Sequence, residues 1–236
     1  ESFRKLEASG AFRYGGNLPK TVNRYGGGLN LGGIKPNKSI LAALEHANTL
    51  QGIAKIKKPA SINFTRKEYE GEMAHYLESK NKINVSIPNI YKELGHIDPA
   101  RRDYEFGRKA GHAVIHEAFH SAYTNPETRK VLEAMIREKT GIGKILPKNL
   151  TPKTLDKFLR KNLGKEYANI IKTQYKGAEV EEIFAAAAPE MFGYAGGRMP
   201  DYKNFAAAPK IPKQLDYIKN NQKLGGVEFK KKGGAL

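Results

Sequence analysis

The sequence predicts an α+β fold that is mainly helical, with a small sheet that precedes a long buried helix. Three observations support this fold class. Apolar residues recur at helical spacing in several segments between residues 36 and 192. Two short stretches, 53–64 and 82–87, alternate apolar with polar residues, as half-buried strands do. Between Arg108 and Tyr123, apolar residues surround the helix on nearly all sides, which is typical of a buried helix.

Residues 1–36 are expected to form a flexible lead-in to one domain at 37–224, followed by a basic, solvated tail at 225–236. The lead-in is rich in glycine and tyrosine and contains a near repeat, Arg13-Tyr14-Gly15-Gly16-Asn17-Leu18 and Arg24-Tyr25-Gly26-Gly27-Gly28-Leu29. So many glycines favour a linker over a core element, although a segment that wraps the domain or covers a cleft is an alternative. The glycines follow no predicted strand and lack the lysine and hydroxyl residue of a phosphate loop, so nucleotide binding is not expected.

The domain is predicted to begin with a helix and two strands. Ser39 is the candidate N-cap of the helix, which Gly52 ends. The strands are the alternating stretches 53–64 and 82–87, and the proline at position 88 suggests an edge strand. An extended peptide can add to an exposed edge as a further strand, whereas an edge without a ligand is the alternative.

The buried helix carries the pattern H-E-x-x-H at His116, Glu117 and His120. Positions i and i+4 of a helix lie one above the other, so the rings of His116 and His120 can bind one ion at about 2.0–2.1 Å. The pattern predicts a zinc site in which Glu117 takes a proton from the zinc-bound water. His112 lies one turn earlier, about 6 Å along the axis, and is expected beside the site. The alternative is a core helix with two hydrogen-bonded histidines.

Further helices are predicted downstream, over 127–139, 151–163 and 167–171, where apolar residues at helical spacing indicate packing on the core. The alanine-rich run 176–192 predicts one more helix, whose small side chains allow close approach to a neighbouring helix. Catalytic zinc needs a third protein ligand, and the chain contains no cysteine. Four glutamates of this last helix compete for the role: Glu179, Glu181, Glu182 and Glu190.

A family resemblance decides among these glutamates. Glu182-Ile183-Phe184-Ala185, with Tyr175 seven residues before Glu182, resembles the anthrax lethal-factor-type metallopeptidases, which include the bacterial Pro-Pro endopeptidases. In that family, H-E-x-x-H is followed by a helix whose ligand glutamate begins a Glu-aromatic/aliphatic-Phe-Ala pattern, and a tyrosine precedes it at the same spacing. Residues 208–220 are similar to the C-terminal helix of the group, and the resemblance covers about 100–222.

The resemblance implies a zincin-like fold and a gluzincin metal site with His116, His120 and Glu182 as ligands of Zn²⁺. It also implies that Tyr175 stabilises the oxyanion of the reaction. The chain departs from the family in having a longer segment between the histidines and the glutamate, which implies an insertion of lysine-rich helices. Ala186 stands where lethal factor has a further carboxylate, a role that Glu179, Glu181 or Glu190 can take instead.

The formal net charge of +17 favours polyanionic partners, which are nucleic acid, anionic membranes or acidic proteins. Lysines are spread along the whole chain, which favours general electrostatic steering over a dedicated nucleic-acid site. No apolar run approaches the roughly 20 residues of a transmembrane helix, and no signal-peptide core opens the chain. The chain begins with Glu1, so release from a larger polypeptide or particle is expected.

Together these features predict a zinc metalloendopeptidase that hydrolyses a specific protein, with an acidic protein bound as an extended strand as the expected substrate. The resemblance implies a delivered toxin or effector, or a secreted or phage-carried protease. Two alternatives stay open. One is a basic nucleic-acid- or particle-associated binding protein with a non-catalytic zinc site, and the other is a metal-dependent hydrolase of a non-peptide bond.

Overall fold

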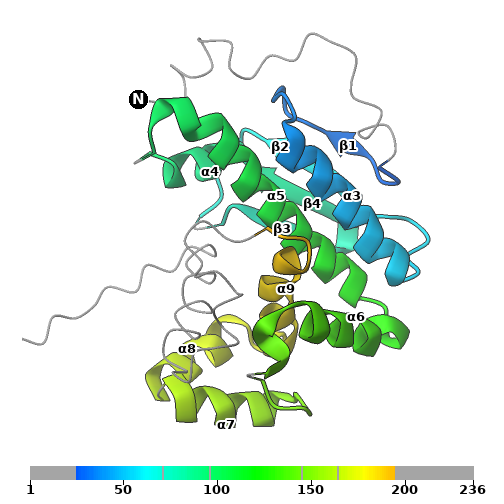
Figure 1. Cartoon of the computed structure of the whole chain (residues 1–236), viewed down its shortest axis with the longest axis vertical. Coiled ribbons are helices and arrows are strands. Elements are labelled where there is room, and N and C mark those ends of the chain that lie inside the picture. Colours follow the sequence, from blue (N-terminus) through cyan, green and yellow to red (C-terminus); the bar gives the residue numbers. More distant parts are fainter. Residues whose placement is uncertain (1–24, 71, 96, 145, 164, 195–236) are drawn as a thin grey trace, which may run out of the picture.

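A computed structural model describes residues 25–70, 72–95, 97–144, 146–163 and 165–194. These residues form a small four-stranded sheet and a larger set of helices, which confirms the predicted α+β fold (Figure 1). The elements in chain order are β1 (Leu29–Asn30), α3 (Lys38–Ile53), β2 (Ser61–Thr65), β3 (Ala74–Leu77), a 3₁₀ turn (Glu78–Lys80), β4 (Lys82–Ser86), α4 (Ile87–Glu93), α5 (Pro99–Tyr123), α6 (Pro126–Lys139), a second 3₁₀ turn (Gly141–Lys144), α7 (Pro152–Leu163), α8 (Lys165–Gln174) and α9 (Glu179–Met191).

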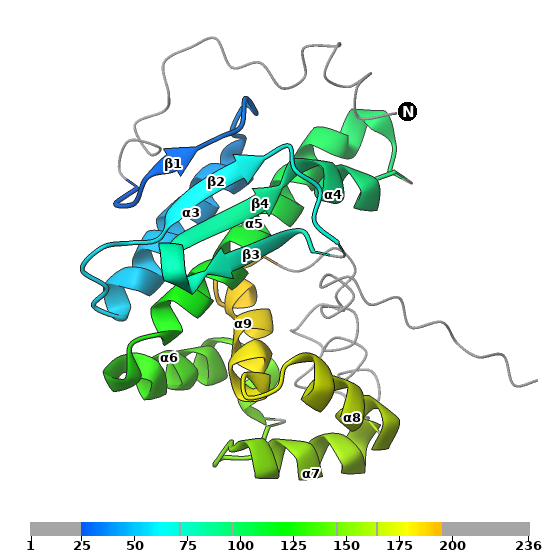
Figure 2. The same cartoon turned by 180° about the vertical axis from the view of Figure 1, so that it is seen from behind.

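The strand order in the sheet is β1-β2-β4-β3. The pairs β1–β2 and β2–β4 are parallel, and β3 runs antiparallel to β4. Ile62 pairs with Ile83 and Phe64 with Val85, and all four side chains are fully buried. Helices α3 and α5 lie behind the sheet in Figure 2, so one face of the sheet is covered by helices. In this strand order, β1 and β3 are the two edge strands of the described sheet.

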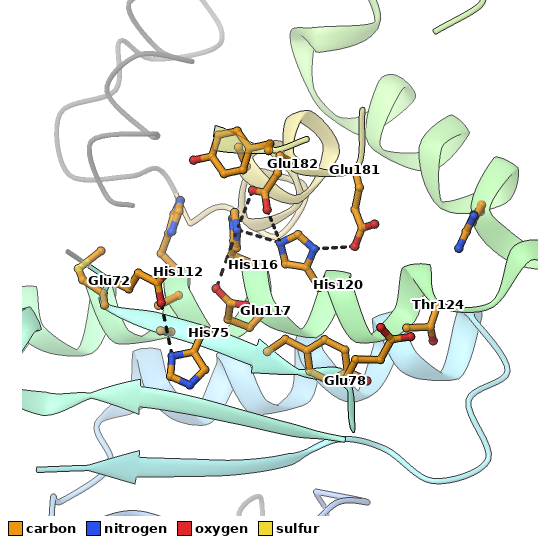
Figure 3. Close-up of a pocket in the computed structure, with 17 residues that line it drawn as sticks. Glu72, His75, Glu78, His112, His116, Glu117, His120, Thr124, Glu181 and Glu182 are labelled. Carbon is orange, nitrogen blue, oxygen red and sulfur yellow. Dashed lines mark hydrogen bonds and ion pairs between the residues drawn. The ribbon is translucent and has the colours of Figure 1, made fainter. Parts of the chain in front are cut away.

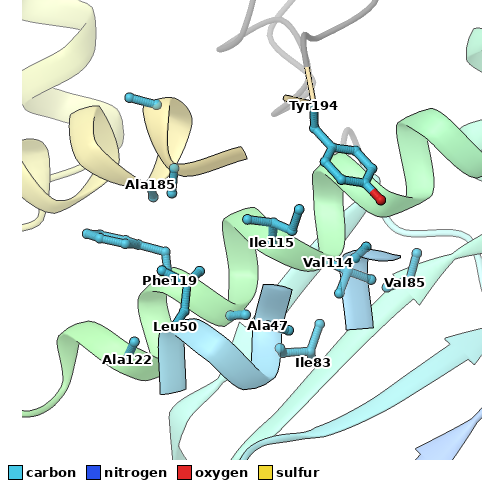
Figure 4. Close-up of a cluster of buried hydrophobic side chains, with 14 of the residues drawn as sticks. Ala47, Leu50, Ile83, Val85, Val114, Ile115, Phe119, Ala122, Ala185 and Tyr194 are labelled. Atoms are coloured by element: carbon cyan, nitrogen blue, oxygen red, sulfur yellow. The ribbon is translucent and has the colours of Figure 1, made fainter. Parts of the chain in front are cut away.

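Helix α5 is the centre of the core. It lies along α3, and α9 packs against its second half (Figure 1). Figure 4 shows Phe119 of α5 with Leu50 of α3 and Ala185 of α9, and none of the three side chains is exposed. Ala47 and Ala185 are small, which lets their helices come close to α5. The helix that carries the H-E-x-x-H pattern is thus held from two sides.

The predicted helices are present as α3, α6, α7, α8 and α9, and α5 begins earlier than expected, at Pro99. Asp98 caps α5 by accepting a hydrogen bond from the backbone N–H of Ala100. The prediction of Ser39 as N-cap of α3 is wrong, because Asn37 accepts the hydrogen bond from Ile40 N–H. The Asn37 amide also donates to Asp103 O at 2.9 Å, so one side chain caps α3 and ties it to α5.

The expectation that residues 1–36 lie outside the core is wrong for residues 25–36. Tyr25 is buried and donates its hydroxyl to Ala60 O at 2.5 Å, and Ile34 is also buried. β1 pairs with β2 in the sheet. A Cβ at Gly27 would lie 2.4 Å from Ala60 O, so glycine here permits close backbone approach. The repeat at 13–18 lies outside the described residues.

The prediction of an edge strand at 82–87 is also wrong, because β4 is paired on both sides. Pro88 lies in the first turn of α4, where proline is tolerated, and carries no information about the sheet edge. The stretch 53–64 is a strand only from Ser61, since α3 continues through Ile53. β3, the actual edge, has only four residues and shows no alternation of burial. The expected helix at 208–220 and the basic tail at 225–236 lie outside the described residues.

Among the described residues, no helix combines the length and the apolar composition that a bilayer-spanning helix needs.

Candidate metal centre

Two helices that are distant in sequence supply the side chains of the site. α5 presents His116 and His120 on successive turns, and the first turn of α9 presents Glu182 to them (Figure 3). One donor atom from each of these residues lies within 4.8 Å of the others. The structure therefore brings together the two histidines of the H-E-x-x-H pattern and the glutamate that the family resemblance implies as the third ligand. This half-buried cluster could hold a metal ion.

The spacing of the donor atoms fits a small tetrahedral ion. His116 Nε2 and His120 Nε2 are 3.2 Å apart, and Glu182 Oε1 lies 3.4 Å from His120 Nε2. Glu182 Oε2 lies 3.6 Å from His116 Nε2. Ligands bound at 2.0–2.1 Å in a tetrahedron are about 3.3–3.4 Å from one another. The two imidazole nitrogens and the Glu182 carboxylate thus lie at about the separations expected of three corners of a tetrahedral coordination shell.

Glu181, next to Glu182 on α9, contacts the other side of the His120 ring. Its Oε1 lies 2.6 Å from His120 Nδ1 (Figure 3). This contact leaves Nε2 of His120 facing His116 and Glu182. The sequence listed Glu181 among the competing ligands, and the structure places it as the carboxylate that orients a histidine. Glu179 accepts a hydrogen bond from Gly177 N–H instead.

The charges at the cluster favour a cation. Burial alone would lower the pKa of His120, but the hydrogen bond with Glu181 and the charges of Glu182 and Glu117 raise that pKa to about 9. Burial would raise the pKa of Glu182, yet its contacts with His116 and His120 lower it below the ordinary value. Glu182 is therefore ionised, and a proton on His120 occupies a position that a metal ion could take.

Glu117 and Tyr175 lie beside the three candidate ligands. Glu117 is buried, and its Oε1 is 4.0 Å from His116 Nε2. Tyr175, between α8 and α9, lines the same cavity. Burial raises the pKa of Tyr175 well above the ordinary value, and the charges of Glu182, Glu72 and Glu117 raise it further. The phenol therefore keeps its proton at neutral pH and can donate a hydrogen bond.

The cavity at the cluster has a volume of about 470 Å³. The edge strand β3 forms one wall, with Ala74, His75 and Tyr76 among the lining residues. Glu72 precedes this strand and faces the same space (Figure 3). The pKa of Glu72 is raised above its ordinary value. Burial is the largest cause, the nearby His75 opposes it, and the charges of Glu117 and Glu182 add to it.

No pattern in the sequence indicates that this wall contributes to the cavity. Glu72 and His75 lie in a segment without alternation or a motif, between the two predicted strands. Only the pairing of β3 with β4 brings them to the metal cluster. No local signal could have identified them.

His112 lies beside the cluster, as its helical spacing predicts. It lines the cavity, is 5% exposed, and its Nε2 has no hydrogen-bond partner among the described residues. Burial lowers the pKa of His112 to about 3, with further lowering by His116, Arg108 and Lys109. The ring is therefore uncharged. Ala186 also lines the cavity, where the resemblance would place a carboxylate.

Comparison of the chain with protein-family models, with curated proteins and with solved structures gives no match.

Proposed function

We propose that this chain is a zinc-dependent endopeptidase with a zincin-like fold, similar to the lethal-factor-type metallopeptidases. One observation carries the proposal. His116, His120 and Glu182 present their donor atoms at tetrahedral spacing, with the carboxylate of Glu117 4.0 Å from one of them. Two histidines and one glutamate form the ligand set of several catalytic zinc sites and leave a fourth position for water.

The donor types favour zinc over calcium or magnesium, which prefer shells made of oxygen atoms. The residues present fit this ion, because both histidines offer Nε2 and Glu182 offers an ionised carboxylate. When bound at such a site, zinc lowers the pKa of water toward neutrality and polarises a carbonyl group.

The residues of the chain supply the remaining steps of peptide hydrolysis. Glu117 accepts a proton from the attacking water as its oxygen bonds to the carbonyl carbon, and the π electrons of the carbonyl move onto its oxygen. Tyr175 donates a hydrogen bond to the oxyanion that results. Glu117 then passes the proton to the leaving nitrogen as the C–N bond breaks, which yields a carboxylic acid and an amine.

The position of β3 supports a peptide as the substrate. Within the described residues, β3 is paired on one side only and lines the cavity with the metal cluster. A substrate in extended conformation can therefore add to this edge by backbone hydrogen bonds and cross the cluster. The resemblance further supports a protease that is secreted or delivered into a target cell.

The proposal is tested with the purified full-length protein, by elemental analysis for zinc and digestion of a peptide library. We expect about one zinc per chain and cleavage by the wild type. Glu117→Gln should keep the zinc and lose cleavage by about 10²–10⁴-fold, because only the proton transfer is removed. Glu138→Gln, on the exposed side of α6, is the matched control and should keep both.

Two outcomes would contradict the proposal. One is a wild type that neither retains zinc nor cuts peptides, and the other is a Glu117→Gln variant that cuts as fast as the wild type. Binding of DNA or RNA that weakens steeply with salt, without proteolysis, would instead support the basic binding protein.

A further inference from the structure

Tyr175 stands on the short turn between α8 and α9, and its ring lines the cavity at the metal cluster. The ring is partly buried and packs against the hydrophobic core. The hydroxyl, by contrast, has no hydrogen bond to another residue in the part of the chain that the structure describes. The direction of the phenol must therefore come from the packing of its ring and from the backbone that carries it.

Two hydrogen bonds fix the backbone at this turn, and the first of them closes it. Ala178 N–H donates to Tyr175 O at 2.7 Å, which makes a turn of four residues. Gly177, the third residue of the turn, has a φ of 86°. Residues with a Cβ rarely adopt such a φ, and glycine does so without strain. A Cβ at position 177 would meet no atom within 4 Å, so the backbone conformation alone calls for glycine.

The second hydrogen bond comes from the first residue of α9. Glu179 Oε2 accepts from Gly177 N–H at 3.1 Å, although Glu179 belongs to the helix that follows the turn. Glu179 is buried, with 9% of its surface exposed. Ala178, the N-cap residue of α9, makes no side-chain hydrogen bond. A carboxylate that accepts from a backbone N–H makes a stronger bond than a neutral acceptor, so Glu179 ties the turn to the start of α9.

The same segment joins Tyr175 to the candidate metal ligand of α9. Glu182 N–H donates to Ala178 O at 2.9 Å, so the last residue of the turn also accepts a hydrogen bond from the first turn of the helix. Glu182 follows Glu179 by three residues and faces His116 and His120 (Figure 3). The turn therefore sets where the phenol lies relative to the metal cluster.

We infer that Gly177 and Glu179 are positioning residues for Tyr175, because the turn that they stabilise aims the phenol at the place where the oxyanion forms. Neither residue lines the cavity, so both act through Tyr175. A donor to an oxyanion is effective only when its position is fixed before the reaction, and a displacement of about 1 Å can cost roughly 10²-fold in rate. This inference rests on the proposed function in taking Tyr175 as the oxyanion donor.

The first test compares substitutions of two glycines in the zinc-loaded full-length protein. Gly177→Ala should lower kcat by about 10–100-fold and leave KM and zinc content within about twofold, because alanine resists a positive φ and shifts the turn. Gly177→Asn should keep most of the activity, since asparagine tolerates a positive φ. Gly193→Ala is the matched control and should leave kcat within about twofold. Gly193 has a φ of 78°, a Cβ there also meets no atom within 4 Å, and it lies past the other end of α9.

The second test asks whether both residues act through the phenol. Glu179→Ala removes the acceptor of Gly177 N–H and should lower kcat by about tenfold, whereas Glu179→Gln keeps an oxygen in its place and should stay within about threefold. In a Tyr175→Phe background, Gly177→Ala and Glu179→Ala should have little further effect on kcat, because no hydroxyl is left to position. Additive losses would overturn the inference, and so would a loss of zinc, which would assign the turn to Glu182.

The third test does not depend on catalysis. Fluorotyrosine is incorporated at the 12 tyrosines of the chain, and the ¹⁹F NMR signal that Tyr175→Phe removes is assigned to Tyr175. Gly177→Ala and Glu179→Ala should shift this signal, whereas Gly177→Asn and Gly193→Ala should leave it in place. Such shifts in a protein that cuts no peptide would support the positioning role and overturn only the proposed function. An unchanged signal in both alanine variants of the turn overturns the inference and leaves the peptidase intact.

Discussion

His120 Nδ1 lies 2.6 Å from Glu181 Oε1, while His120 Nε2 faces the opposite way, 3.4 Å from Glu182 Oε1. Two adjacent residues of α9 therefore contact the two nitrogens of one imidazole. Glu182 is placed as a candidate metal ligand, whereas Glu181 orients the ring so that Nε2 faces His116 and Glu182.

Glu181→Gln should weaken metal binding without removing it. The amide keeps the size of the side chain but loses the negative charge that orients and polarises His120. Carboxylates in this role typically contribute 10–100-fold to metal affinity, and we expect a loss of about this size. Competition with a chelator of known affinity measures it. Unchanged affinity would show that Glu181 does not act through His120, and Glu138→Gln serves as the control on α6.

Tyr175→Phe should slow catalysis and leave the metal in place. The phenol is expected to donate to the oxyanion, a contact whose loss costs about 10²–10³-fold in kcat. KM and zinc content should change little, because the ring still fills the same wall of the cavity. Steady-state kinetics on a fluorogenic peptide give both constants. An increase in KM with constant kcat would instead assign Tyr175 to substrate binding.

The metal-free protein should lose stability as the pH rises from about 6.5 to about 9. The pKa of His120 is raised from 6.5 to about 9 in the fold, so its protonated form stabilises the fold fully below 6.5, and this contribution is lost as the pH rises through about 9. Thermal unfolding in chelator at several pH values measures the decrease in Tm. Glu181→Gln removes the main cause of the raised pKa and should flatten the curve. A wild-type curve already as flat as that of the variant would contradict this account.

Gly107→Ala should destabilise the fold even though alanine favours helices. The new Cβ would lie 1.8 Å from Asn37 Nδ2, so the cap of α3 and its bond to Asp103 O would be displaced. We expect a loss of about 1–3 kcal/mol in the free energy of unfolding, measured by chemical denaturation. Gly52→Ala in α3 meets no atom within 4 Å and should be neutral or stabilising by up to about 1 kcal/mol. Equal effects of the two changes would show that propensity outweighs the contact.

The helical part of the molecule follows from the sequence because its signals are local. The H-E-x-x-H spacing places His116 and His120 on one face of any helix. The alanines after Glu182 predict a helix that can pack closely against another. The choice of Glu182 over Glu181 needed the resemblance, because both lie in the first turn of α9 and their directions depend on how α9 docks on α5.

The sheet could not be predicted in the same way. β1 has two residues and β3 four, so neither shows a period, and both exist only because β2 and β4 offer partners. The glycines near Tyr25 suggested flexibility, but Gly27 is needed where two backbones approach closely. The glutamate-lined wall at Glu72 also depends on the pairing of β3 with β4, so no local pattern indicates it.

Asn30, Asn63 and Asn84 occupy paired positions on β1, β2 and β4, and we call them the asparagine row. Their side-chain amides give the sheet a net dipole direction that its mixed strand order lacks. Every amide in the row donates toward β3, so the small dipoles add head to tail and end with their positive pole at His75, next to the Glu72 carboxylate. Strands that do not line the cavity thereby orient a histidine ring that does. A single aspartate or leucine in place of Asn63 would break this alignment on β2, two strands away from His75 on β3.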